Sequence, residues 1–446
     1  MIPLSCFDRF HAVPWTSAYW EHFRESAFLY GRWERTLREG LSPLVHFVDG
    51  LDERFLANEE ALTLAPSNQL ASAFEEALDD PPDKGGVVAL SLAMVGSGTA
   101  ALEEQVLSAM ESHPQHMWHI MRALELSWRD PTPLALRRLR ETKTGSVAAA
   151  LLYVLAERSH RFGAELQPYL QDTAAEVRAA ALRCATNANI ASRPWIEQAL
   201  DDPNLDVRDA AREAFLGLDI AASVSELRRA FDHRADRSDL VTTVLAITTN
   251  AEDIDRLQQG LHEPEHRRQV VWALSFSGSP HVADLCLDLM GDEDVADLAA
   301  EAFQSITGIR VRTTLVPSSN GGDRASKTDQ PWQLPRTRWR APAPAGDTQI
   351  DHDTAAAVWQ AQKRSRAPVR GRMLGGAPLT GTTLVNALRS APLRQRHVRA
   401  LELGLRSGGR ARVKTLNWGW HQLETLKALK VPEPLWCDVP LEKAAH

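Results

Sequence analysis

Cysteine is scarce in this sequence, and its cysteines are far apart. The 446 residues include four, at Cys6, Cys184, Cys286 and Cys437, with no CxxC pair and no cluster with histidine. Neither a disulfide framework nor a structural zinc site is therefore supported. Dispersed free thiols are typical of a reducing cytoplasm, so we expect a cytoplasmic protein.

Long apolar runs and strand-forming residues are also missing. No stretch approaches the roughly 20 apolar residues that cross a bilayer. The N-terminus carries Asp8 and Arg9 with no apolar run after them, which does not match a signal peptide. Only four Tyr and twelve Phe stand beside many Ala, Leu, Arg and Glu. The composition thus favours helices and indicates no membrane segment.

Sequence motifs that carry chemistry are absent as well. GxxxxGK[ST], GxSxG and HExxH do not occur, and no Gly-Gly pair follows a strand signal. The densest histidine set is His113, His116 and His119, with Pro114 placing the first in a turn. We interpret these histidines as polar helix positions. The sequence therefore predicts no catalytic residue, no cofactor and no metal ligand, and we expect no enzyme.

A repeat of about 30 residues runs through the middle of the chain. At a shift of 30, Val177-Arg178 falls on Val207-Arg208, and Ala180-Ala181 falls on Ala210-Ala211. Self-similarity at such a period is the signature of a stacked repeat architecture. We count about eight units between roughly 67 and 306.

Each unit predicts two helices. The first ends at a turn such as Asp202-Pro203 or Glu263-Pro264, because proline cannot continue a helix but suits its first turn. The second carries apolar residues at 207, 210, 211, 214 and 215, which is one face of a 3.6-residue period. One pair cannot bury this face alone, so successive pairs must stack into a solenoid.

The Val-Arg pair that opens the second helix is similar to HEAT repeats. We therefore predict an all-α fold, a HEAT-like α-solenoid in which helical hairpins form a right-handed superhelix. The resemblance implies a ladder between adjacent units, in which Arg178 and Arg208 pair with Asp172 and Asp202. The alternative is solvated charge at helix starts.

Four segments follow from these patterns. Aromatic residues between 15 and 33 form a helical cap that either closes the solenoid end or offers a face to a partner. The segments are 1–66, the N-terminal cap; 67–308, about eight HEAT-like helix pairs; 309–350, a linker or lid rich in Pro, Arg and Trp; and 351–446, a basic helical C-terminal region with one HEAT-like pair.

Charge is distributed unevenly between these segments. Residues 309–446 hold 23 Lys+Arg and 10 Asp+Glu, while residues 1–308 have a balance of −21. Such asymmetry requires a physical explanation. We predict that the lid lies across the acidic repeats or meets a partner through Trp332, Arg336, Arg338, Trp339 and Arg340. The alternative is a grip on single-stranded nucleic acid, although an acidic repeat region repels phosphates.

Several local motifs resemble one family of uncharacterised proteobacterial HEAT-repeat proteins, over most of the chain. The motifs outside the repeats are His22–Leu29, Leu51–Arg54, Gly371–Pro378, Arg394–Arg396 and Ala400–Leu403. The resemblance implies a cytoplasmic protein without established catalytic residues, sometimes encoded near type VI secretion genes. It therefore implies an adaptor or immunity role.

The function predicted from the sequence is a non-catalytic scaffold for protein binding. Its concave face would hold a toxin, an effector or a secretion component. Two alternatives remain open at this point. The first is a nucleic-acid-associated protein that uses the basic C-terminal region, and the second is a HEAT-like enzyme of the DNA glycosylase or lyase type.

Overall fold

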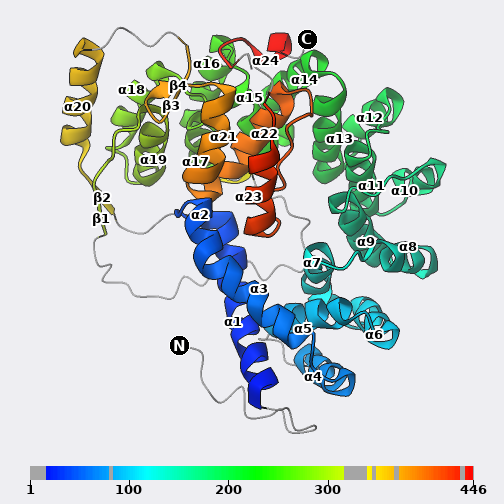
Figure 1. Cartoon of the computed structure of the whole chain (residues 1–446). Coiled ribbons are helices and arrows are strands. Elements are labelled where there is room, and N and C mark those ends of the chain that lie inside the picture. The colour runs from blue at the N-terminus through cyan, green and yellow to red at the C-terminus, as the bar shows by residue number, and fades with distance from the viewer. Residues whose placement is uncertain are drawn as a thin grey trace. The chain divides into compact units, whose positions relative to one another are not determined.

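The described part of the chain is predominantly helical (Figure 1). The computed structural model describes residues 17–79, 84–315, 339–343, 348–365, 371–431 and 437–444. Strands in these residues are limited to two short antiparallel pairs. The predicted all-α, solenoid-like fold class is therefore confirmed.

The chain forms two compact units that alternate along the sequence. Unit 1 holds the described residues up to Ala214 together with Leu416–His421. Unit 2 holds those from Phe215 to Thr415 and those from Gln422 onward. The two units are defined by packing contacts, whereas the four predicted segments were defined by sequence pattern. The predicted boundaries at 66, 308 and 350 therefore stay predictions.

The first thirteen α-helices belong to unit 1, and α13 continues into unit 2. A π-helical turn, Val48–Asp52, joins α2 to α3. The helices are α1 (Ser17–Glu39), α2 (Leu44–Phe47), α3 (Glu53–Leu62), α4 (Ser67–Asp79), α5 (Lys84–Ser97), α6 (Ala100–Ser112), α7 (Met117–Leu126), α8 (Thr132–Glu141), α9 (Gly145–Glu157), α10 (Gln167–Leu170), α11 (Ala175–Asn187), α12 (Arg193–Leu200) and α13 (Leu205–Leu218).

The remaining elements belong to unit 2, except that α23 begins in unit 1. They are α14 (Ile220–Asp232), α15 (Asp239–Ile247), α16 (Ala251–Gln259), α17 (Pro264–Leu274), α18 (Pro280–Leu289), α19 (Ala296–Thr307), α20 (His352–Ser365), α21 (Gly381–Ser390), α22 (Arg396–Arg406), α23 (Gly419–Ala428) and α24 (Leu441–Ala444), with β1 (Thr313–Leu315) paired to β2 (Thr348–Ile350) and β3 (Met373–Leu374) paired to β4 (Ala377–Pro378).

Helices α4 to α19 follow one another as eight successive pairs, and the second helices of the pairs contribute much of the core. Helices α5, α7, α9 and α11 pack in order in unit 1, as α15, α17 and α19 do in unit 2. In α9 every residue from Val147 to Ala156 is buried. A helix that is apolar on all sides must be covered on all sides, so stacking explains the Ala- and Leu-rich sequence of α9.

The period of about 30 residues also appears in the backbone at the ends of these second helices. Ser159 and Asn189, after α9 and α11, both have φ of 56°. Thr249, Gly278 and Gly308 follow α15, α17 and α19 with φ of 70°, 67° and 72°. A left-handed residue is a common way to end a helix. The repeat therefore specifies where each second helix ends as well as which face is apolar.

None of the described helices combines the length and the apolar character that a membrane-spanning segment requires.

Candidate functional site

The predicted ladder has a rung between Arg178 and Asp202. Arg178 Nε and Nη2 donate to the two oxygens of the Asp202 carboxylate at 2.8 and 3.0 Å. This two-pronged geometry is the strong form of the pair. Burial raises the pKa of Asp202, but hydrogen bonds from Arg178 and the amide of Asn204, together with the charges of Arg178 and Arg208, outweigh it and hold this pKa below its usual value.

Asp172 and Arg208 contribute through the main chain. Arg178 Nη1 donates to the carbonyl of Asp172 at 2.8 Å, and Arg208 Nη1 donates to the carbonyl of Asp202 at 2.7 Å. The Asp172 carboxylate accepts from the amide of Ala174 at 2.8 Å. Each arginine therefore binds a main-chain carbonyl in the turn before its own helix. The ladder expected from the sequence included only pairs with carboxylates and not these carbonyls.

Further ion pairs join residues 24 to 33 positions apart, and the sequence analysis did not predict them. Their arginines and acids are spread along both units rather than confined to the Val-Arg motif. They include Arg137–Glu104 and Arg183–Glu213 in unit 1, and Arg228–Asp253, Arg237–Glu263, Arg256–Asp232, Arg267–Asp292 and Arg268–Asp297 in unit 2.

Two of the predicted lid residues, Trp339 and Arg340, are described. Trp332, Arg336 and Arg338 lie outside the described residues. The Trp339 side chain is buried in the core of unit 2, whereas Arg340 is exposed.

Gln269 of α17 binds two main-chain groups of the segment that begins at Trp339. Gln269 Nε2 donates to the carbonyl of Trp339 at 2.9 Å, and Gln269 Oε1 accepts from the amide of Ala341 at 2.7 Å. Burial raises the pKa of Asp239, and the positive charge of Arg340 partly offsets this shift. Arg340 therefore lies within electrostatic reach of an acidic side chain of the repeats.

The β3–β4 hairpin covers the ends of two second helices in unit 2. Amides of Gly375 and Gly376 donate to Ser305 O and Ile306 O of α19 at 2.8 and 2.9 Å. The amide of Met373 donates to Gly278 O at 2.7 Å. The last carbonyls of a helix have no partner inside it, so the hairpin supplies the missing donors. A Cβ at Gly376 would collide with Thr307 O, and Gly375 has a φ of 60°, so both positions of the turn favour glycine.

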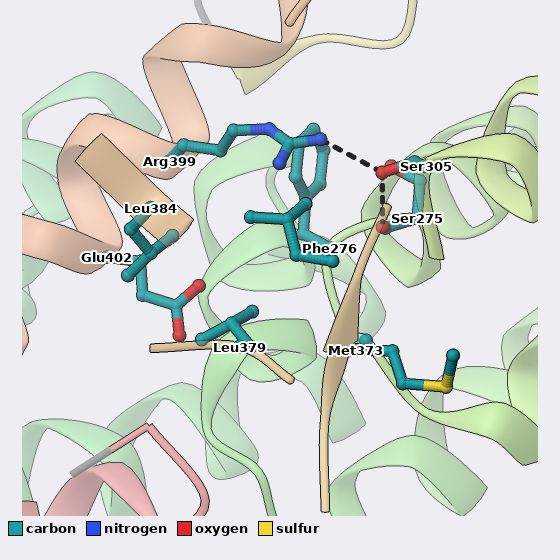
Figure 2. Close-up of a pocket in the computed structure, with 10 residues that line it drawn as sticks. Ser275, Phe276, Ser305, Met373, Leu379, Leu384, Arg399 and Glu402 are labelled. Carbon is teal, nitrogen blue, oxygen red and sulfur yellow. Dashed lines mark hydrogen bonds between the residues drawn. The ribbon is translucent and has the colours of Figure 1, made fainter. Parts of the chain in front are cut away.

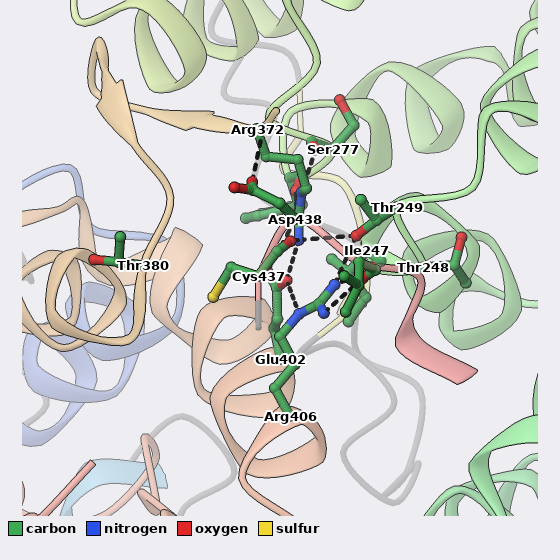
Figure 3. Close-up of polar contacts among 12 residues, drawn as sticks. Ile247, Thr248, Thr249, Ser277, Arg372, Thr380, Glu402, Arg406, Cys437 and Asp438 are labelled. Carbon is green, nitrogen blue, oxygen red and sulfur yellow. Dashed lines mark hydrogen bonds and ion pairs between the residues drawn. The ribbon is translucent and has the colours of Figure 1, made fainter. Parts of the chain in front are cut away.

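Beside this hairpin lies a buried cluster of Arg372, Glu402 and Arg406, here called the arginine clamp (Figure 3). Both arginines bind the Glu402 carboxylate. Arg372 also donates to Phe276 O and Ser277 O at 2.7 and 2.6 Å.

Arg406 extends the clamp to α15 and to the end of the chain. It donates to Ile247 O at 2.9 Å and to Val439 O at 3.1 Å. Both clamp arginines reach the Thr249 hydroxyl, Arg406 at 2.7 Å and Arg372 at 3.4 Å. Thr249 has φ of 70°, which is strained for a β-branched residue. The clamp thus holds this strained turn in place.

The electrostatics of the clamp favour permanent ion pairs. Burial alone raises the pKa of Glu402, but Arg372 and Arg406 outweigh it and hold this pKa below its usual value. Burial raises the pKa of the neighbouring Cys437 thiol to about 12, so this sulfur stays protonated at neutral pH. The clamp therefore joins helix ends, and the Cys437 thiol is not activated for nucleophilic chemistry.

The aromatic cap of unit 1 receives part of the C-terminal region. Trp418 lies 5.3 Å from Trp33 and 5.2 Å from Phe55 between ring centroids. Its Nε1 donates to Leu126 O, at the end of α7, at 2.7 Å. One of the predicted cap aromatics, Trp33, thus packs against the chain's own C-terminal region.

Asp52, at the end of the π-helical turn, fixes this contact. Its carboxylate accepts from Trp33 Nε1 at 2.7 Å and from the amides of Gly419 and Trp420 at 3.0 Å each. These amides open α23, where a carboxylate is favoured by the helix dipole. Burial raises the pKa of Asp52, and the three hydrogen bonds partly offset this shift.

A buried arginine, Arg122, also binds the C-terminal segment that contains Trp418. Arg122 pairs with Glu34 at 3.0 Å and with Glu125 at 2.6 Å, and it donates to the carbonyl of Leu416. Its guanidinium lies 5.5 Å from the Trp33 ring centroid. Within unit 1, residues 416–420 are therefore held by both polar and aromatic contacts.

One of the three histidines, His116, differs from its interpretation as a polar helix position. His116 is buried, and its Nε2 lies 3.0 Å from Leu78 O. Burial lowers the pKa of His119 to about 4. Among the described residues, the three ligand atoms close enough to hold a metal belong to Glu263, Glu265 and His266. Glu263 already forms ion pairs with Arg234 and Arg237, which compensate its negative charge.

Sequence reasoning found one ladder rung but not the clamp. Arg372 and Glu402 appeared only as members of motifs that carry the family resemblance. Thr249 and Arg406 belonged to no predicted motif. Comparison of the chain with protein-family models, curated proteins and solved structures yields no match.

Proposed function

We propose that this protein is a non-catalytic scaffold of HEAT type that binds a basic protein partner. The proposal rests on an exposed apolar edge in unit 1. Leu64 after α3 is 74% exposed, and Trp128 after α7 is 39% exposed. Large exposed apolar side chains that gather in one place mark contact sites for proteins, and tryptophan is common among the residues that dominate such contacts.

The two side chains belong to one edge because α5 brings them together. A Cβ at Gly96 of α5 would meet the Trp128 ring at 2.8 Å and Thr63 Cγ2 at 2.9 Å. Leu64 directly follows Thr63. The balance of −21 over residues 1–308 supports a partner of positive charge, because complementary charge steers encounter.

Purification of the tagged full chain from its host at several salt concentrations tests this proposal. We expect one stoichiometric protein with the unchanged chain. The double variant Leu64→Ser, Trp128→Ala should lose at least ten-fold of this binding. Val358→Ser, at a site 41% exposed in unit 2, is the matched control and should retain it. Recovery of no partner at any salt concentration would overturn the proposal.

The finer role that we propose is that of an adaptor or immunity protein of a type VI secretion system. Co-expression with the product of a neighbouring gene separates the two roles. Growth rescue of cells that produce a toxic neighbour supports immunity, whereas binding without rescue supports an adaptor.

Nucleic-acid binding is a weaker explanation of the basic C-terminal region. Arg372, Arg396, Arg399 and Arg406 are buried, so four of its cations are absent from any surface that phosphates could reach. Their charge instead serves contacts inside unit 2.

A further inference from the structure

A small cavity in unit 2 leaves no room for a ligand larger than water (Figure 2). It lies between Arg399 and Glu402 of α22 and Ser305 of α19. The centre of a water-sized sphere fits into about 10 Å³ of it, which is the room of one water molecule. Unit 1, by contrast, contains a short segment that connects the C-terminal region to the proposed partner edge.

This segment, Leu416–His421, is here called the strap. It belongs to unit 1, whereas the described residues on both sides of it belong to unit 2. A segment this short has no core of its own, so the contacts that it makes with the cap must offset the entropy lost when it is ordered. Those contacts centre on the Trp418 ring and on the Asp52 carboxylate.

The strap fits the cap so closely that one of its positions requires glycine. A Cβ at Gly419 would lie 2.7 Å from Val48 Cγ2 and 2.9 Å from Phe47 Cδ1. Non-bonded carbon atoms pack best at about 3.5–4.0 Å. Alanine at this position would therefore push the strap away from the cap.

The strap also reaches the loop that carries Trp128, one of the two side chains of the partner edge. Trp418 Nε1 donates to Leu126 O at 2.7 Å, two residues before Trp128. The last carbonyls of α7 have no donor within their own helix. The bond from Trp418 therefore fixes the point at which the loop Ser127–Asp130 begins.

A second contact with this loop runs through Arg158, which directly follows α9. Arg158 donates to Ser127 O, immediately before Trp128, and to Leu124 O at 3.1 Å. Burial lowers the pKa of His421 in the strap, and the positive charge of Arg158 lowers this pKa further. Two residues of the strap, Trp418 and His421, thus approach the groups that hold the start of the loop.

We propose that the strap controls the partner edge: its docking on the cap holds the loop Ser127–Asp130 and fixes Trp128 in the conformation that binds the partner. This inference rests on the proposed function, because the partner edge is the contact surface proposed there. Trp128 is 39% exposed, and ordering such a side chain during binding costs free energy, so a loop that is ordered in advance binds more tightly. Since coupling is reciprocal, a bound partner in turn holds the strap on the cap.

Trp418→Phe provides the first test, because it keeps an aromatic ring in the cap but removes the donor to Leu126 O. In the full chain labelled with 5-fluorotryptophan, the fluorine NMR signal of Trp128 reports on the loop and is assigned by its loss in Trp128→Ala. This signal should shift and broaden in Trp418→Phe. Trp33→Phe is the matched control, because it shrinks a ring of the same cluster but loses a bond to Asp52 instead of α7, and it should leave the signal in place. An unmoved signal in Trp418→Phe would overturn the proposal.

Partner binding by the same variants supplies the second test. Trp418→Phe should weaken binding about five-fold, which corresponds to the net contribution of one hydrogen bond, and Trp33→Phe should bind like the unchanged chain. Equal binding by both variants would overturn control by the strap and leave the scaffold proposal standing. If the unchanged chain binds no partner, the scaffold proposal fails, and the fluorine signal still decides whether the strap holds the loop.

A glycine pair tests the strap without any change to its tryptophans. Gly419→Ala should reproduce both effects of Trp418→Phe, because the added Cβ displaces the strap from Val48 and Phe47. Gly31→Ala in α1 is the control, since an added Cβ there meets nothing within 4 Å, and it should change neither the signal nor the binding. A Gly419→Ala chain that behaves like Gly31→Ala would contradict the proposal.

Discussion

Two buried carboxylates of this protein, those of Glu402 and Glu59, differ in how their negative charge is compensated. Glu402 has two arginines and stays ionised. Glu59 of α3 is completely buried, and neither of its oxygens has a hydrogen-bond partner of standard geometry among the described residues. Burial raises its pKa well above the usual value, and the nearby Ser26 hydroxyl offsets this only in part. Glu59 therefore binds a proton more tightly in the folded state than in the unfolded chain.

Glu59→Gln should flatten the dependence of stability on pH. Because the folded-state pKa lies above the unfolded value of about 4.3, the free energy of unfolding falls as pH rises between the two values. The slope reaches at most about 1.4 kcal/mol per pH unit, and glutamine cannot ionise. Urea unfolding between pH 4.5 and 8 measures this difference. Glu60→Gln, at an exposed neighbour, should keep the slope of the unchanged protein; equal slopes in both variants would refute the assignment.

At the scale of elements, ion pairs connect successive helix pairs. The Arg178 and Asp202 side chains are 18% and 11% exposed, so water screens their pair less than it screens a surface pair. Arg178 also binds the carbonyls of Asp172 and Thr173. One side chain thus links the turn before α11 to the turn after α12.

A double-mutant cycle should show this link as a coupling energy. We expect about 1–2 kcal/mol between Arg178→Met and Asp202→Asn, because the pair is two-pronged and partly buried. The exposed pair Arg193–Glu197, at 3.7 Å, serves as control and should give under about 0.5 kcal/mol. Since the Asp202 pKa is lowered in the folded state, the coupling should be present at neutral pH and fade as pH falls through that pKa. Equal coupling in both pairs would show that the rung adds no stability.

At the scale of the whole molecule, the chain forms unit 1 first and unit 2 next, and a short C-terminal segment belongs to unit 1 again. Residues Leu416–His421 belong to unit 1, although their neighbours on both sides belong to unit 2. Trp418 is the centre of this return, because it packs on Trp33 and Phe55 and is itself buried. Unit 1 is therefore complete only when the C-terminal region has been made.

Trp418→Ala should destabilise unit 1 by about 3–5 kcal/mol, the usual loss for a buried tryptophan. Hydrogen exchange should accelerate in α1 and α3, where its aromatic partners lie. Trp420→Ala removes a ring that is 36% exposed and should change stability by under about 1 kcal/mol. Unchanged exchange in α1 and α3 of Trp418→Ala would contradict a stabilising role for this contact.

The repeats were predictable because their signals are local. The spacing of Val207, Ala210 and Ala211 predicts a buried face, and the Val-Arg motif led to the pair of Arg178 with Asp202. Contacts outside the repeats had no such signal. Arg372 binds main-chain carbonyls, which every residue possesses, so no particular residue type 95 positions away marks its partner Ser277. Trp33 and Trp418 are 385 positions apart and share no motif.

The sequence by itself determined the helices, their period of about 30 residues and the need to stack, because a helix pair with one apolar face is unstable alone. Only the tertiary structure decided what covers the helix ends. Carbonyls at a helix end accept any donor that the fold brings near them, and in unit 2 those donors come from Arg372, Arg406 and the Gly375-Gly376 turn. Sequence pattern specifies which side chains avoid water, but the partners of main-chain groups depend on how distant segments meet.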